Sequence, residues 1–79
     1  MAVTDMKDQD LGRLVKSLRD QLGLSQEKLA ARMGVTFSSV NRWENGHSKP
    51  SPLAMQKIEE LVIGLGEAGK ELHDEFFPQ

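Results

Sequence analysis

The stretch that decides the fold of this chain is residues 25–46, SQEKLAARMGVTFSSVNRWENG. Ser25 is a typical helix N-cap, because its hydroxyl can accept a hydrogen bond from a backbone N–H of the first turn. Apolar residues follow it at helical spacing: Leu29, Ala30 and Met33. Gly34 stands where a left-handed C-cap belongs, so one short helix with both ends marked is predicted here.

A second helix is predicted over residues 36–45, with Thr36 as its N-cap. Val40 and Trp43 are its apolar positions, and Asn45-Gly46 is a turn dipeptide that ends it. Trp43 falls on the core side, which favours packing over base stacking. The stretch therefore predicts two short helices joined by a turn of about three residues.

Further helices are predicted on both sides. Before the stretch, Asp10 is an expected N-cap for one apolar stripe: Leu11, Leu14, Val15, Leu18 and Leu22. After it, Ser51-Pro52 opens a helix whose apolar face is Ala54, Met55, Ile58, Leu61, Val62 and Leu65. A last short pattern starts at Glu67 and contains Ala68, Leu72, Phe76 and Phe77. The chain is predicted to be all-α, with a flexible N-terminal arm (1–9), a helical domain (10–66) and an acidic C-terminal helix or tail (67–79).

Composition limits the chain to one small domain, because it has 79 residues and no cysteine to form disulfides. Its net charge of −2 hides a strong segregation. Residues 11–57 carry eight Lys and Arg against three acids, a charge of +5, while residues 58–79 carry one Lys against six acids, a charge of −5. A basic body with an acidic end suits a surface that faces phosphates, although solvated charges alone would give the same pattern.

The second helix of the stretch has two faces when its residues are placed at 100° intervals. Val40, Trp43 and Glu44 fall toward the core. A polar wedge faces away from it and contains Ser38, Asn41, Arg42 and Asn45. The fork of Arg42 can bond both O6 and N7 of guanine, while Ser38 and Asn41 can each address several bases or a phosphate. Phe37 lies at the border, where it would either touch a thymine methyl group or pack against the fold.

The run LGLSQEKLAARMGVTFSSVNRWENGHSKPS resembles the phage-repressor and Cro type (XRE-like) of helix-turn-helix DNA-binding proteins. The residues that carry the resemblance are Ser25-Gln26, Leu29-Ala30, Gly34-Val35, Val40, Trp43-Glu44, Gly46 and Pro50. The resemblance covers residues 11 to about 65 and implies a compact lambda-repressor-like bundle of four or five helices, with the second motif helix in the major groove. It also implies an internal ion pair between Arg19 and Glu44.

The resemblance and the wedge together predict a DNA-binding site. The residues expected at base edges are Phe37, Ser38, Asn41 and Arg42. The residues expected near phosphates are Ser25, Gln26, Thr36, Ser39, Asn45, His47 and Lys49. Gln26 belongs there because it begins a helix whose N-terminus carries partial positive charge, although His47 is also a typical solvated loop residue.

The expected function is transcriptional regulation by sequence-specific binding to double-stranded DNA, with the chain acting as a repressor and as a homodimer on a palindromic operator. Such a role would place it in the cytoplasm, on the nucleoid. The alternative is an antitoxin or regulatory module that binds a partner protein through residues 67–77, with Leu72, Phe76 and Phe77 as its apolar contacts. A second subunit would bind at the same segment.

Other functions are not supported by the sequence. Residues 64–69 match the dinucleotide-binding pattern G-x-G-x-x-G, but that pattern requires a preceding strand, and here a helix precedes it. His73 beside Asp74 and Glu75 lacks the second histidine expected of a zinc site. The chain contains no catalytic set, no signal-peptide pattern and no apolar run long enough to span a membrane, so we expect no enzyme, cofactor or metal site.

Overall fold

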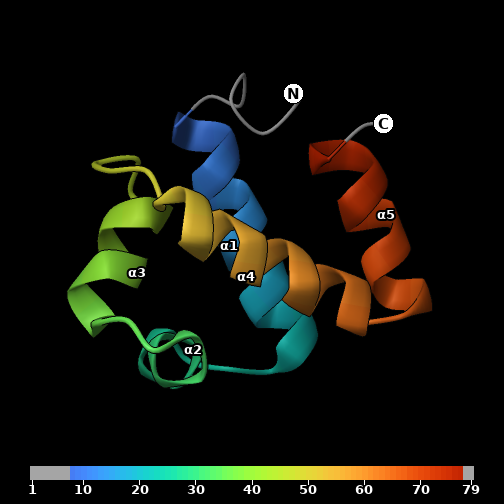
Figure 1. Ribbon diagram of the computed structural model, residues 1–79, viewed down its shortest axis with the longest axis horizontal. Helices are drawn as coiled ribbons and strands as arrows, with labels where there is room; N and C mark the ends of the chain where they lie inside the picture. Colours follow the sequence, from blue (N-terminus) through green and yellow to red (C-terminus); the bar gives the residue numbers. More distant parts are fainter. Residues whose placement is uncertain (1–7, 78–79) are drawn as a thin grey trace.

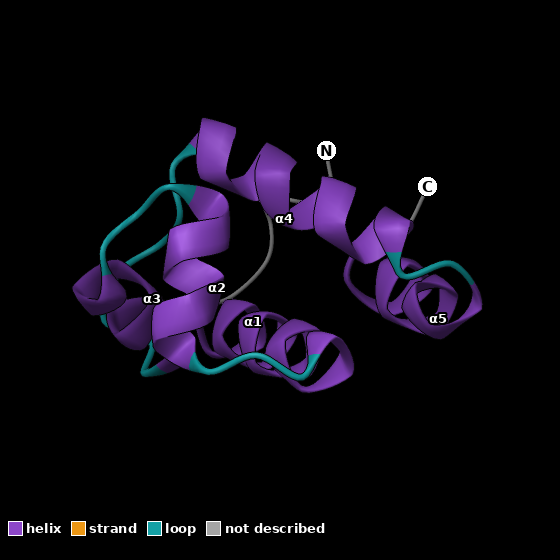
Figure 2. Ribbon diagram, turned by 90° about the horizontal axis from the view of Figure 1, so that it is seen from below, coloured by secondary structure: helices purple, strands orange, loops and turns teal. Residues whose placement is uncertain are grey.

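The computed structural model describes residues 8–77, which form five α-helices joined by short loops. They are α1 (Asp8–Leu22), α2 (Gln26–Met33), α3 (Phe37–Glu44), α4 (Pro52–Gly64) and α5 (Glu67–Phe76). Helices α1 and α4 lie in the middle of the molecule, with α2 and α3 at one end and α5 at the other (Figure 1). All elements of the described chain are helices and loops (Figure 2), so the predicted all-α bundle is confirmed.

The N-termini of α2, α3 and α4 are capped by the residues that the sequence predicts. The side-chain oxygens of Ser25, Thr36 and Ser51 each accept a hydrogen bond from the backbone N–H three residues later, at 3.1, 3.2 and 3.1 Å. A cap of this kind contributes about 1 kcal/mol. Gly34 ends α2 with φ 72° and ψ 31°, a left-handed conformation that glycine adopts without steric cost. Local sequence therefore sets both ends of α2 and the start of α3.

The core is built from all five helices. Its largest fully buried side chains are Leu14, Leu18, Leu29, Ile58, Val15, Val40 and Val62. Removing each of the larger ones from water stabilises the fold by roughly 1.5–3 kcal/mol. Helix α3 packs on α1 and α2, and α5 packs on α1 and α4. The core therefore holds α3 from its inner side and leaves its outer side to solvent.

Two glycines allow helices to approach closely. A Cβ atom at Gly12 in α1 would lie 2.7 Å from the carbonyl oxygen of Glu44, at the end of α3. A Cβ atom at Gly69 in α5 would overlap the carbonyl oxygen of Val62 and lie 2.8 Å from Cβ of Leu65. Both positions are buried. Any larger residue would force α1 away from α3, or α5 away from α4.

The structure corrects two details of the predicted elements. Helix α1 begins at Asp8, so Asp10 lies inside its first turns and is not the N-cap; residues 1–7 of the predicted arm lie outside the described part. In α5, Ala68 is exposed, and the buried stripe runs through Gly69, Leu72 and Phe76. The reason is the close approach of α5 to α4 at position 69, where a Cβ atom would overlap the carbonyl oxygen of Val62.

Candidate nucleic-acid interface

Helix α3 presents an apolar face to the core and a polar face to solvent. Val40 and Trp43 are buried, at 0% and 5% exposure. Ser38, Arg42 and Asn45 are exposed, as the helical geometry predicts. Phe37 is 49% exposed, so it is not a core residue. The outer face of α3 therefore carries one arginine, small polar groups and one phenyl ring.

The only acidic residue of α3 is turned inward and neutralised. Arg19 Nε donates to Glu44 Oε2 at 2.7 Å, and Arg19 Nη2 donates to Glu44 Oε1 at 3.1 Å. Side-chain exposure is 17% for the arginine and 7% for the glutamate. The hydrogen bonds to Glu44 raise the pKa of Arg19 despite the opposing effect of burial, so the guanidinium stays charged. The structure thus contains the ion pair that the family resemblance implies.

Arg19 also joins α3 to the segment before α2. Its Nη1 donates to the backbone carbonyl of Leu24 at 3.1 Å, and this loop residue leads directly into the capped start of α2. The guanidinium of this α1 residue therefore contacts both the loop after α1 and helix α3. This geometry uses the planar arginine fork, which a lysine could not reproduce.

The polar network continues from the ion pair to the outer face of α3 through Gln26. Gln26 Nε2 donates to Glu44 Oε1 at 3.0 Å, and Gln26 Oε1 accepts from Asn41 Nδ2 at 3.2 Å. Asn45 Nδ2 then donates to Asn41 Oδ1 at 3.2 Å and to its backbone oxygen at 2.9 Å. The first residue of α2 is thereby bonded to two successive turns of α3. These contacts fix the orientation of α3 against α2.

This network gives two predicted contact residues a structural role. Asn41 is half-buried, and both ends of its amide are bonded within the protein. Gln26 is also half-buried and bonded at both ends, although its amide nitrogen has a second N–H that can reach a phosphate. No sequence pattern identifies these contacts, because the partners lie 15 and 18 positions apart and belong to different helices.

Replacing Gln26 by alanine should lower the free energy of unfolding by about 1–3 kcal/mol. The reason is that the substitution leaves the partly buried Glu44 without one donor and Asn41 without its acceptor. Urea denaturation followed by circular dichroism measures this difference. Gln21→Ala, at an exposed position of α1, is the matched control and should change stability by less than about 0.5 kcal/mol. Equal stabilities of the two variants would contradict the structural role of Gln26.

The other predicted phosphate contacts surround α3. Ser25 and Thr36 are exposed N-caps of α2 and α3, and the hydroxyl oxygens of Thr36 and Ser39 lie 3.0 Å apart. His47 and Lys49 are exposed in the loop that follows α3. N-termini of helices attract anions, because their free N–H groups and the helix dipole point outward. The helix starts and this loop therefore frame the outer face of α3 with groups that can bind phosphate.

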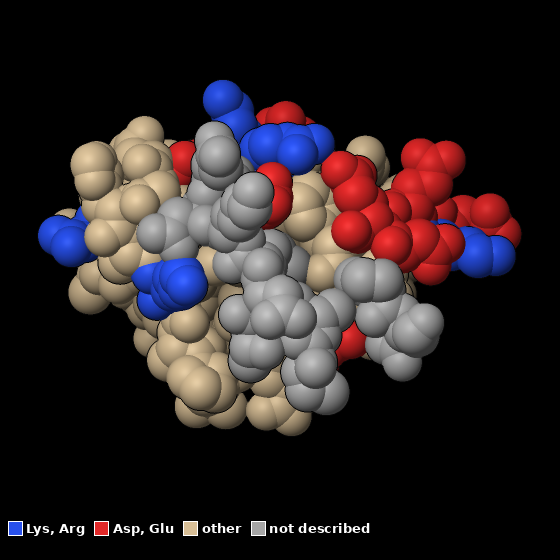
Figure 3. All heavy atoms as spheres, turned by 90° about the horizontal axis from the view of Figure 1, so that it is seen from above, with Lys and Arg blue, Asp and Glu red and all other residues tan. Residues whose placement is uncertain are grey.

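Charge is separated along the molecule. Acidic side chains gather over α5, at the end opposite α2 and α3 (Figure 3), where the exposed acids of this helix are Glu67, Glu71, Asp74 and Glu75. This end would repel a nucleic acid backbone. The segregation seen in the sequence therefore becomes a separation in space, with α3 remote from the acidic end.

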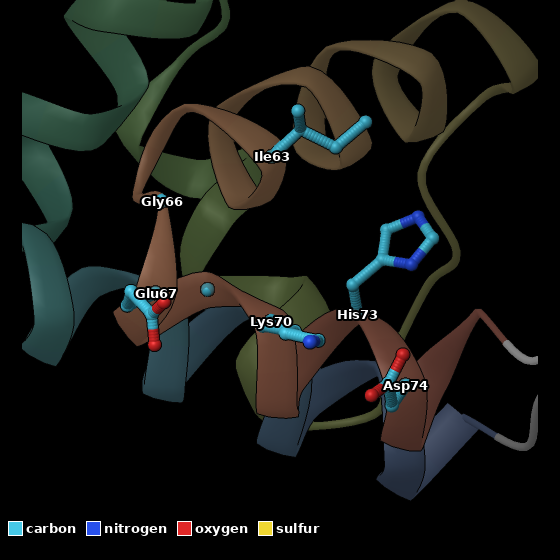
Figure 4. Close-up of a pocket in the computed structure, with 7 residues that line it drawn as sticks. Ile63, Gly66, Glu67, Lys70, His73 and Asp74 are labelled. Carbon is cyan, nitrogen blue, oxygen red and sulfur yellow. The ribbon is translucent and has the colours of Figure 1, made fainter.

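A hollow of about 350 Å³ lies between the end of α4 and α5 (Figure 4). Its lining residues are Ile63, Gly66, Glu67, Gly69, Lys70, His73 and Asp74. The ring of His73 is held at its edge, with Nε2 2.9 Å from Glu59 Oε2 and the ring stacked on Phe77 at 5.3 Å. Because this hollow lies at the α5 end, it takes no part in the surface around α3.

The helix-turn-helix family model matches residues 15–62, the segment from α1 to α4 that builds and supports the α2–α3 pair. This chain belongs to the helix-turn-helix family. The matched segment includes residues 22–51, so the helix-turn-helix family that their resemblance implied is confirmed.

The chain is similar to several transcriptional regulators. An uncharacterized HTH-type transcriptional regulator of Sinorhizobium medicae is 31% identical over 55 residues, covering 70% of this chain and 40% of the relative. An uncharacterized HTH-type transcriptional regulator of Methanothermobacter thermautotrophicus is 40% identical over 45 residues, covering 57% of this chain and 65% of the relative. An uncharacterized transcriptional regulator in the ATPase CF(0) region of Rhodospirillum rubrum is 30% identical over 79 residues, covering 91% of this chain and 73% of the relative. No solved structure matches the chain significantly.

The chain spans only about 40% of the length of the Sinorhizobium relative. The match to it therefore concerns less than half of that relative. Among residues 8–77, no cluster of His, Cys, Asp and Glu is arranged to hold a metal ion. In the same residues no helix has the length and apolarity needed to cross a membrane.

The structure corrects the role expected for the C-terminal segment. Leu72, Phe76 and Phe77 were the apolar residues predicted to bind a partner through residues 67–77, yet all three are buried, at 9%, 6% and 2% exposure. They are buried because α5 packs on α1 and α4. Arg13 of α1 covers the ring of Phe76 at 5.6 Å and donates to Glu75 at 3.1 Å. These side chains complete the core and are not a docking surface.

Proposed function

We propose that this chain regulates transcription by sequence-specific binding to double-stranded DNA, and that it acts as a repressor by occupying an operator. The observation that carries the proposal is the outer face of α3, which exposes Arg42 and Ser38, while the only carboxylate of the helix is turned inward, 7% exposed and paired. A helix with these groups can enter the major groove without repelling the phosphates. The names of the relatives support the same role.

In this proposal the residues divide into three tasks. Arg42, Ser38 and Phe37 lie at base edges, with Arg42 bonded to guanine. The groups near phosphates are Ser25, Thr36, Ser39, Asn45, His47, Lys49 and the second N–H of Gln26. Asn41 was predicted to read bases, but its hydrogen bonds favour a positioning role, in which it keeps α3 aligned.

We also propose a homodimer on a palindromic operator. A single module of this kind buries roughly 600–1,000 Å² on DNA, which gives limited specificity by itself. Two copies related by a two-fold axis would read half-sites about 34 Å apart. Selection of bound sites from random DNA, followed by footprinting, tests both points. Two protected half-sites are expected, whereas a random pool without enrichment would reject sequence-specific binding.

Replacing Arg42 by alanine should cost about 1–3 kcal/mol of binding free energy and remove discrimination at one base pair per half-site. Arg42→Lys is the matched variant, because it keeps the charge and loses the planar fork. It should retain most affinity for scrambled DNA while losing discrimination. Fluorescence anisotropy on operator and scrambled duplexes measures both quantities. If Arg42→Ala weakened binding to the two duplexes equally, Arg42 would contact phosphate and not a base.

A protein-binding module, such as an antitoxin, is the less supported function. Its predicted anchor residues are buried in the core. What α5 leaves exposed is mainly acidic. Steep loss of DNA affinity with increasing salt is expected under the first proposal, because bound phosphates release counterions. Co-purification of one stoichiometric protein, without DNA affinity, would favour the module instead.

A further inference from the structure

Phe37 is an exposed aromatic residue on a surface that is otherwise polar. It is the first residue of α3 and is 49% exposed. In the described residues the other exposed large apolar side chains are Leu53 and Ile63, and both belong to α4. Phe37 therefore stands alone on the helix whose outer face forms the candidate interface.

The residues next to Phe37 in the sequence, Thr36 and Ser38, are polar and exposed. The hydroxyls of Thr36 and Ser39 are paired with each other, and Ser38 is exposed. A phenyl ring forms no strong hydrogen bond with a phosphate or with the polar edge of a base. In the major groove of B-DNA, the apolar group that a base presents is the 5-methyl group of thymine.

We propose that Phe37 reads the 5-methyl group of one thymine in each half-site. This inference rests on the proposed placement of α3 in the major groove, and it adds the identity of one base. Arg42 follows Phe37 by five positions, which corresponds to a rise of about 7.5 Å along the helix axis. At 3.4 Å per base pair, the thymine lies within about three base pairs of the guanine bound by Arg42.

The size of the effect follows from burying one methyl group. A buried CH₂-sized group contributes about 0.8 kcal/mol, and about 1.4 kcal/mol corresponds to a tenfold change in affinity. Loss of one methyl group should therefore weaken binding about fourfold, and loss from both half-sites of a dimer about fifteenfold. This difference is well within the resolution of an anisotropy titration.

The test replaces thymine by deoxyuridine, which removes only the methyl group. Each thymine of the selected operator is replaced in turn, symmetrically in both half-sites, and affinity is measured for the unaltered chain. One position should show the loss of about fifteenfold. Equal affinities for all the thymine and deoxyuridine duplexes would overturn the proposal without any variant of the protein.

Variants then assign the methyl contact to Phe37. Phe37→Ala and Phe37→Gln should bind the thymine and deoxyuridine duplexes equally, because neither offers the phenyl contact. Ile63→Ala is the matched control, since it removes a 61% exposed apolar residue at the remote end of α4 and should keep the full sensitivity. Circular dichroism verifies that each variant is folded. Sensitivity that persists in folded Phe37→Ala or Phe37→Gln would overturn the assignment.

The outcome separates the two levels of the proposal. If selection from random DNA yields no preferred site, the proposed function itself fails. If a preferred site exists and no thymine methyl group matters, DNA binding stands and only the role of Phe37 is rejected.

Discussion

Replacing Arg19 by alanine should lower the free energy of unfolding by about 3–5 kcal/mol, which is the usual cost of removing one partner from a buried ion pair. The Glu44 carboxylate, 7% exposed, would keep only the hydrogen bond from Gln26. The backbone carbonyl of Leu24 would lose its donor as well. For a domain of this size the melting temperature should fall by at least about 12 °C.

Arg13 provides the matched control for this prediction. It also pairs across helices, with Glu75 at 3.1 Å, but its side chain is 65% exposed. Because water screens exposed pairs, Arg13→Ala should cost only about 1 kcal/mol, including its contact with the ring of Phe76. Thermal and urea denaturation of the two variants provide the comparison. If Arg19→Ala were no more destabilising than Arg13→Ala, the ion pair of Arg19 would not be a determinant of stability.

Replacing Gly69 by alanine should destabilise the protein by about 3 kcal/mol, at the upper end of the range for an overpacked core. The new methyl group would overlap the Val62 carbonyl oxygen and crowd Cβ of Leu65, and the first of these is rigid backbone. Helix α5 would have to move away from α4, and Leu72 and Phe76 would lose part of their contact with the core. The free energy of unfolding from urea titration is the measurement.

Gly64 is the control for Gly69. It is the last residue of α4, and a Cβ atom there meets nothing within 4 Å. Gly64→Ala should therefore stabilise the chain by about 0.4–1 kcal/mol, since alanine reduces the freedom of the unfolded state. The same substitution, glycine to alanine, is therefore expected to raise the free energy of unfolding at position 64 and to lower it at position 69. A stabilising Gly69→Ala would show that the approach of α5 to α4 is looser than described.

Much of the fold was predictable from the sequence because helix boundaries depend on neighbouring residues. Ser25, Thr36 and Ser51 cap the helices that they were predicted to cap, and Gly34 adopts the left-handed conformation. The inward side of α3 was also predictable, since helical spacing places Val40 and Trp43 together. These features require only the periodicity of one helix and the chemistry of its ends.

Other features depend on which helices meet. Ala68 was placed in the apolar pattern of the last helix and is exposed, because the choice between it and Gly69 depends on how closely α5 can approach α4. In the alternative function, the apolar residues of the C-terminal segment would bind a partner, but α1 and α4 already cover them. A narrow apolar stripe has the same sequence pattern whether it packs against another protein or against other helices of its own chain.

The candidate site shows the same division. Arg42 and Ser38 are exposed as predicted, while the part that Gln26, Asn41 and Glu44 play in one hydrogen-bonded network becomes visible only when α2 is placed against α3. Phe37 was open between packing and DNA contact, and its exposure excludes the core.

The sequence by itself therefore determined the five helices, the caps of α2, α3 and α4, the helix-turn-helix family and the outward face of α3, because these follow from contacts within a few residues along the chain. Only the tertiary structure decided which polar residues of that surface are committed to the fold, and where α5 finds its core contacts. The physical reason is that hydrogen bonds and close packing between residues 15 or more positions apart depend on the distance between helices, which no local pattern encodes.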